Sequence, residues 1–264
     1  MKKLVLTLAA IAAFTGSAMA ADMAPRTYSK APAMVPMAPS WTGFYIFGGG
    51  GYGIWDADED TRVTTTGAIL SNSHNRFGGD GYFGTVGAGY DWQFNQSWVA
   101  GIFADGQFGS LRGTMADPFN GVSGDVKNRT NAAAGVRVGY LVAPNVLSYV
   151  NGGYSYAEFS GSTLFTQGGL GGSVPITTTP GFHRNGWFLG GGVENNLNIF
   201  GISAPGWFMK TEYRVAEYER ATLPESFLAG GPTGFSLTIK PIVQTVSTSL
   251  VYRFNWGGPV VANY

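Results

Sequence analysis

Residues 207–215 read WFMKTEYRV, and two kinds of side chain alternate strictly along this stretch. The uncharged residues stand at odd positions and the charged ones at even positions: Trp207, Met209, Thr211, Tyr213 and Val215 against Lys210, Glu212 and Arg214. Successive side chains of a β-strand point to opposite faces, so the pattern predicts a strand with one apolar and one charged face. A soluble sandwich would bury the apolar face in a core and leave the charges in water. A membrane barrel would turn the apolar face to lipid and the charges to its lumen, and alternation alone leaves both open.

The chain beyond residue 40 divides into eight such segments. They are residues 41–55, 79–93, 97–113, 128–141, 146–160, 184–196, 207–221 and 241–256. Short breaks at 94–96, 142–145 and 197–206 alternate with long ones at 56–78, 114–127, 161–183 and 222–240. Every proline beyond residue 40 falls in a break, at the first residue of a segment or in the tail, as a closed sheet requires. The pattern predicts an all-β fold, an eight-stranded antiparallel up-and-down transmembrane β-barrel with long outer loops and short periplasmic turns.

The N-terminal segment predicts export. Lys2 and Lys3 precede an apolar run that ends in Ala18-Met19-Ala20, the pattern of a secretory signal peptide over residues 1–20. Four prolines mark residues 21–40 as a periplasmic linker, so we expect the barrel over 41–256 and a tail over 257–264.

Composition restricts the class further. Charged residues make up only 12% of the chain and aromatic residues 14%, with 41 glycines. Basic and acidic residues number 16 each, so loss of Lys2 and Lys3 leaves a slight acidic excess, which disfavours nucleic-acid binding. The absence of cysteine excludes disulfides and thiolate metal sites. Strand length, export and loop asymmetry together favour the outer-membrane barrel over the sandwich.

The same alternation assigns eight charged side chains to the lumen. They are Asp91, Asp105, Arg137, Glu194, Lys210, Glu212, Arg214 and Arg253, four acidic and four basic. An eight-stranded barrel has an interior only wide enough for its own side chains. Because buried charges must be paired, we expect a balanced ionic plug rather than a conducting pore.

Residues 44–55, FYIFGGGGYGIW, contain the spacing G-x-G-x-x-G at Gly48, Gly50 and Gly53. A dinucleotide site needs a helix directly after the glycines, whereas an acidic and threonine-rich run without helical period follows Trp55. We therefore interpret the stretch as a barrel strand, in which glycine makes room where a small barrel bends.

Three stretches carry a family resemblance. Trp41-Thr42-Gly43-Phe44-Tyr45 follows a proline-rich linker, Gly139-Tyr140 precedes a Pro-Asn turn, and the last segment ends Leu250-Val251-Tyr252-Arg253-Phe254. Together they resemble the small eight-stranded, porin-family outer-membrane proteins of α-proteobacteria, a group that includes haemin-binding barrels. The resemblance implies an outer-membrane location, contact with membrane lipid and lipopolysaccharide, and insertion by the barrel-assembly machinery guided by the last strand. One feature departs from the family pattern, in which the last strand commonly finishes at the chain's final aromatic residue: here Trp256 is followed by eight more residues that end at Tyr264.

Candidate ligand sites are few. His74 and His183, the only histidines, flank long outer segments, and each has an arginine beside it or two residues away, so haem capture at the outer rim is one hypothesis. Asp56, Asp58 and Asp60 begin a calcium-loop spacing, but Thr61 and Gly67 stand where glycine and glutamate are required.

No spacing indicates a catalytic set, a metal or another cofactor. The sequence predicts a non-enzymatic envelope protein with structural and surface-interaction roles, with small-solute passage and haem binding as alternatives.

Overall fold

The computed structural model describes residues 40–71, 75–117, 119–166, 172–199 and 202–254. The expected signal peptide, nearly all of the linker and the tail lie outside these residues. No helix among the described residues is long and apolar enough to cross a membrane.

All regular structure in the described residues is β. The strands are β1 (Gly43–Val63), β2 (Asn75–Gln93), β3 (Trp98–Asp117), β4 (Val122–Ala143), β5 (Val146–Phe159), β6 (Ser162–Thr166), β7 (Pro175–Thr179), β8 (Phe182–Ile199), β9 (Ile202–Tyr218), β10 (Ala221–Phe227) and β11 (Pro232–Arg253). Antiparallel neighbours follow the order β1-β2-β3-β4-β5-β8-β9-β11, and β11 pairs with β1 to close the ring. The predicted eight-stranded antiparallel barrel is confirmed.

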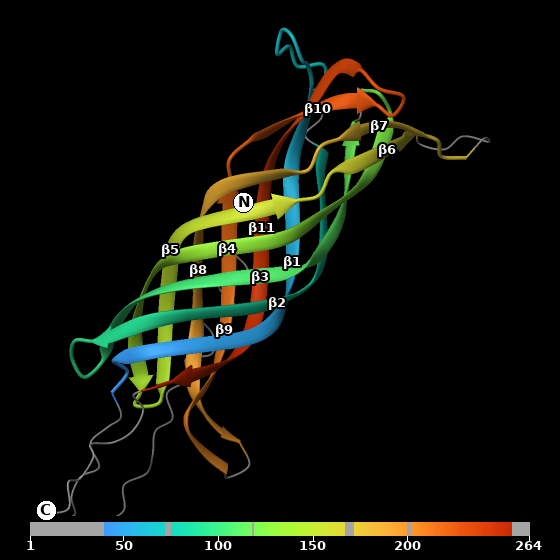
Figure 1. Ribbon diagram of the computed structural model, residues 1–264. Coiled ribbons are helices and arrows are strands. Elements are labelled where there is room, and N and C mark those ends of the chain that lie inside the picture. Colours follow the sequence, from blue (N-terminus) through green and yellow to red (C-terminus); the bar gives the residue numbers. More distant parts are fainter. Residues whose placement is uncertain (1–39, 72–74, 118, 167–171, 200–201, 255–264) are drawn as a thin grey trace, which may run out of the picture. The chain divides into compact units, whose positions relative to one another are not determined.

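Three of the eight predicted strands continue past a two-residue interruption, which raises the number of separate strands to eleven. β5 continues into β6, β7 into β8 and β9 into β10. The short strands add the pairings β4–β6, β6–β7, β7–β10 and β10–β11, so the ring stays closed above β5, β8 and β9. Figure 1 shows β6, β7 and β10 together at one end of the barrel, opposite the short turns.

The strands also run further than expected into the segments predicted as long outer loops. β1 and β11 stay in one register from Tyr45↔Arg253 to Val63↔Phe235. Residues 56–63 contain many polar side chains, which made them resemble a loop, but Ala57, Glu59 and Thr61 are buried while Asp58 is exposed. Pairing with neighbouring strands thus extends the sheet beyond the apolar stretch. The segments that connect the strands at this end are therefore shorter than predicted and are confined to the hairpin tips.

The glycine-rich stretch lies within β1, with no helix after it. A Cβ on Gly49 would meet the backbone of Thr248 and Ser249, and one on Gly51 would meet Val246 and the ring of Phe83. Glycine therefore allows β1 to approach its neighbours closely at the seam with β11, as expected for a strongly curved sheet.

The outward face of the ring carries an apolar band bounded by aromatic residues. Near the short turns lie Phe44, Trp92, Trp98, Tyr140, Trp207 and Phe254, and toward the other end lie Tyr52, Tyr82, Phe108, Tyr154 and Trp187. Aliphatic side chains such as Ile46, Ile102 and Val136 are exposed between them. Beyond the second set, outward residues become charged, including Asp58, Arg112, Arg129 and Glu158. The band marks the membrane-spanning part, and the charged extension lies outside it.

Candidate functional site: the charged lumen

All eight charged residues assigned to the lumen lie inside the ring and are buried. Each occupies an inward position of an alternating strand, and six different strands contribute: β2, β3, β4, β8, β9 and β11. The structure separates them into two groups of four. The lower quartet, nearer the short turns, is Asp91, Arg137, Glu194 and Arg253, and the upper quartet is Asp105, Lys210, Glu212 and Arg214.

The lower quartet forms a closed ring of ion pairs. Arg137 holds Asp91 through two hydrogen bonds, of which Nε–Oδ1 measures 2.9 Å, and its Nη1 lies 3.2 Å from Glu194 Oε2. Arg253 Nη2 lies 2.8 Å from both Asp91 Oδ2 and Glu194 Oε1. Each arginine therefore contacts both carboxylates, which is the paired geometry that buried charges require.

The upper quartet is built around Arg214 and Glu212. Arg214 makes a bidentate pair with Asp105 at 2.8 and 3.0 Å and also donates to Glu212 Oε1 at 2.8 Å. The other oxygen of Glu212, Oε2, accepts hydrogen bonds from the Tyr149 hydroxyl at 2.8 Å and the Asn151 amide at 2.9 Å. Lys210 Nζ lies 3.7 Å from the same oxygen. Glu212 thus accepts hydrogen bonds from three side chains and forms an ion pair with a fourth.

Aromatic rings pack against the cations of both quartets. The Arg137 guanidinium lies 4.3 Å from the Tyr45 ring centre and 5.2 Å from that of Tyr149. Lys210 Nζ lies 3.4 Å from the centre of Phe47. Such cation–π contacts are strengthened when water is excluded. Because Tyr149 contacts Arg137 with its ring and Glu212 with its hydroxyl, it joins the two quartets.

Sequence reasoning named the charges but missed these neutral partners. Tyr45, Phe47, Tyr149 and Asn151 occupy inward positions of β1 and β5, and applying the alternation to those strands would have found them. It also missed Glu59, Asp117 and Glu225, three buried acids in segments that the sequence predicts to be long loops.

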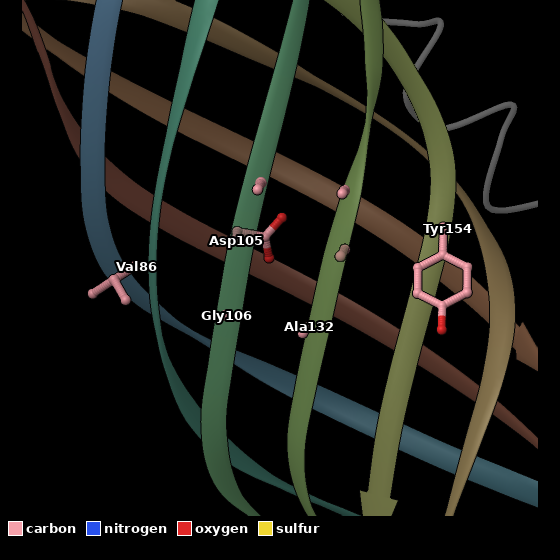
Figure 2. A pocket seen from close by; sticks show the side chains of 8 residues that line it. Val86, Asp105, Gly106, Ala132 and Tyr154 are labelled. Atoms are coloured by element: carbon pink, nitrogen blue, oxygen red, sulfur yellow. The ribbon is translucent and has the colours of Figure 1, made fainter.

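The lumen is filled at this level. The cavity beside Arg214, lined also by Gln107, Asn131 and Tyr218, holds about 10 Å³. A single water needs roughly 10–15 Å³, so this space accommodates one molecule at most. A larger hollow of about 380 Å³ lies around outward alanines of β3 and β4 and is flanked by Val86 and Tyr154 (Figure 2). It faces the membrane band and therefore gives solutes no route through the barrel.

One of the two histidines belongs to the described part of the chain. His74 lies outside the described residues, whereas His183 on β8 is exposed and its ring stacks on Tyr156 with centres 5.7 Å apart. Among the described residues, no group of three histidines or carboxylates could hold a metal ion.

A closed antiparallel ring, an apolar outward band between aromatic girdles and a paired ionic interior define a transmembrane β-barrel of the outer-membrane type. Residues 27–203 match the family described as the autotransporter beta-domain, and the chain belongs to that family.

The relatives agree on location. The chain is 28% identical over 263 residues to the 31 kDa outer-membrane immunogenic protein of Brucella melitensis, and the match covers 94% of this chain and 98% of that protein. The same protein of Brucella suis matches equally well. This chain is accordingly an outer-membrane protein, similar to those of α-proteobacteria as its sequence motifs implied.

Solved structures show weaker likeness. OprG of Pseudomonas aeruginosa, an outer membrane protein, aligns with a TM-score of 0.49 and 11% identity over 80% of this chain and 97% of its own. Neisserial surface protein A aligns with a TM-score of 0.40 and 13% identity over 81% of this chain and 98% of its own. Likeness at this level says nothing about function.

Proposed function

We propose that the protein is a closed, non-conducting and non-enzymatic barrel of the outer membrane, whose role is structural and is exerted through its outer surface. The observation that carries the proposal is the pair of ionic quartets across the lumen. In these quartets, every charged side chain assigned to the lumen forms an ion pair with a side chain of opposite charge.

A conducting lumen would require a different arrangement of the same residues. Rings of charge in a channel face water and exchange ions. Here Asp91, Glu194 and Arg137 are at most 3% exposed, and each makes its hydrogen bonds to protein. Opening a path would therefore mean separating buried ion pairs, which costs several kcal/mol for each ion.

The experiment is single-channel recording on the full-length refolded protein in planar bilayers. We expect no stepwise conductance for the wild type under conditions in which a known porin conducts. Glu212→Gln preserves side-chain volume and should also stay silent if the lumen is packed. Stable ion-selective steps in the wild type would overturn the proposal and support the alternative of small-solute passage.

The outer surface supports the second half of the proposal. Beyond the membrane band the ring continues outward and carries exposed charges of both signs, among them Asp58, Arg112, Arg129 and Glu158. We propose that this extension contacts lipopolysaccharide and other surface partners. Loss of the protein should then sensitise cells to bile salts, and unchanged sensitivity would argue against an envelope role.

Two further expectations stay predictions. The haem-capture hypothesis depends on His74, which lies outside the described residues. Haemin titration of the wild type and of the His74→Ala/His183→Ala variant tests it, and identical titration curves would contradict it. Insertion by the barrel-assembly machinery also stays open, because the residues after Phe254 lie outside the described part.

A further inference from the structure

Three carboxyl groups are buried together in the extension, beyond the membrane band. Glu59 lies on β1, Asp117 at the end of β3 and Glu225 on β10, and none is more than 2% exposed. Each belongs to a different strand of the outer part of the ring. We call these residues the acidic trio.

Asp117 has its own set of donors. Its oxygens accept hydrogen bonds from the Thr61 hydroxyl at 2.6 Å, the Phe119 amide at 2.8 Å and the Asn120 side chain at 2.6 Å. Several donors of this kind stabilise the ionised form of a carboxyl group. Asp117 is therefore the member of the trio whose two oxygens both accept hydrogen bonds.

Glu59 and Glu225 lack comparable donors. The Ala116 amide donates to Glu59 Oε2 at 3.2 Å, whereas Glu59 Oε1 and both oxygens of Glu225 have no donor among the described residues. Glu225 faces Asp117, and two carboxyl groups can share a hydrogen bond only if one carries a proton. A proton on Glu225 allows this side chain to donate that hydrogen bond to Asp117.

No buried cation faces the trio in the described part of the extension. The inward side chains of four neighbouring strands are uncharged at this level: Leu237 and Ile239 on β11, Thr177 and Thr179 on β7, Ser162 and Leu164 on β6, and Val122 and Val126 on β4. On β1 itself, Arg62 pairs with Asp60 at 3.5 Å, and Lys240 on β11 pairs with Glu217. The four basic residues that are buried among those with described side chains all belong to the quartets in the lumen.

The electrostatics follow from this placement. Burial, opposed by the hydrogen bond from the Ala116 amide and assisted by the charges of Asp117 and Glu225, raises the pKa of Glu59 to about 8. Burial likewise raises the pKa of Glu225 to about 7, with Asp117 as the second cause. Both groups are therefore protonated in the folded protein under mildly acidic conditions.

We propose that the acidic trio is a proton-operated latch that holds the outer end of the barrel closed. With protons on Glu59 and Glu225, Glu225 donates a hydrogen bond to Asp117 and β10 stays paired with β11 and β7. When both protons leave, three negative charges share an apolar enclosure. Their repulsion then drives β10 outward.

The element that moves is β10 with its hairpin. It spans seven residues, and Gly230, Gly231 and Gly234, which follow it, all have positive φ. Glycine permits such conformations without strain, so the tip can rearrange while the long ladder between β1 and β11 stays intact. Opening would expose the buried side chains of Leu223 and Leu237 at the outer surface.

The direction of the pH response follows from linkage. A carboxyl group whose pKa is higher in the closed state binds its proton more tightly there, so closure is most stable below the ordinary glutamate pKa. That stability falls as pH rises and is lost through about pH 7–8, where the two groups ionise. The latch is therefore shut in acid and released in mild alkali.

The test uses spin labels, because the chain contains no cysteine of its own. Labels at Phe227→Cys on β10 and Thr114→Cys on β3, in the full-length protein in nanodiscs, report the distance between the two strands. We expect one narrow distance at about pH 5.5 and a longer, broader distribution at about pH 9. An unchanged distribution across this range would overturn the proposal.

Matched variants distinguish the latch from a general effect of alkali. Glu59→Gln with Glu225→Gln should keep the narrow distance at both pH values, whereas Glu219→Gln, at an exposed position beside β10, should retain the full response. A response that persists in the double glutamine variant would also overturn the proposal. If that variant does not fold, Glu225→Gln alone should shift the midpoint, and a midpoint identical to that of the wild type would refute the latch.

Discussion

Single side chains hold the lumen together, and Glu212 connects the most partners among them. It accepts hydrogen bonds from Tyr149, Asn151 and Arg214 and faces Lys210. Removing one partner of a buried pair leaves the other charge uncompensated, which is more harmful than replacing both. The network is therefore most sensitive at the acceptor that several donors share.

Glu212→Ala should destabilise the barrel by roughly 3–5 kcal/mol, because Lys210 loses its paired charge inside the ring. The measurement is the urea midpoint of the refolded protein in detergent, followed by the heat-induced gel shift. Thr211→Ala, which alters the adjacent outward residue, is the matched control and should change stability little. Equal midpoints for the two variants would mean that the network contributes nothing to stability.

Gly101 is a second sensitive residue, since a Cβ there would occupy the position of Asp91 Oδ1. Gly101→Ala should displace Asp91 from Arg137 and lower stability by roughly 2–5 kcal/mol. Gly84→Ala on the neighbouring strand is the control, because its Cβ would meet no atom closer than 3.8 Å. Matching unfolding curves for both variants would show that the lower quartet tolerates the added methyl group.

At the scale of the strand, the sequence pattern did not predict that the strands continue outward beyond the membrane band. Charged residues alternate with buried ones in β1 as far as Thr61, and the β1–β11 register continues to Val63. Backbone pairing protects such segments from proteolysis, whereas hairpin tips remain accessible. Cleavage therefore distinguishes an extended strand from a long loop.

A broad-specificity protease added to intact cells should cut at the exposed tip around 64–69 and leave residues 56–63 intact. Mass spectrometry of the fragments identifies the bond that is cleaved. Permeabilised cells provide the comparison, since only they should yield cuts at the short turns on the other side. Early cleavage within 56–63 would show that this part is a loop in the membrane-bound protein.

At the scale of the whole molecule, closure depends on the first and last strands meeting in the correct register. Ile46 is opposite Tyr252 across this seam, and both side chains lie on the outward face. Because a strand rises about 3.3 Å per residue, a shift of six residues separates two positions by about 20 Å. A short thiol cross-linker can therefore test the register directly.

Ile46→Cys with Tyr252→Cys should cross-link efficiently and give a species that migrates anomalously after boiling in detergent. Ile46→Cys with Val246→Cys, displaced by six residues along β11, should not cross-link. Comparable yields for both pairs would contradict the register of the closed ring.

Local pattern determined much of this architecture. Alternation in Trp207–Val215 and its counterparts predicted the fold class and the inward position of every charge in both quartets, because side chains of a strand point to alternate faces whatever surrounds it. The glycines at the seam could also be interpreted from the sequence, since their role follows from backbone geometry. The expectation that prolines fall between strands was wrong, because Pro205, Pro224 and Pro241 lie within β9, β10 and β11.

Other features needed the folded ring. Which acid meets which arginine depends on the stagger between strands far apart in the sequence, and Arg214 and Asp105 are 109 residues apart. The extension was missed because its inward residues include Glu59 and Glu225, acids that look solvated in a sequence and become buried only when β6, β7 and β10 close the ring above them. Alternation along one strand determines which face of the sheet a side chain lies on. Which side chains then become its partners depends on how the sheet closes, and closure involves all the strands together.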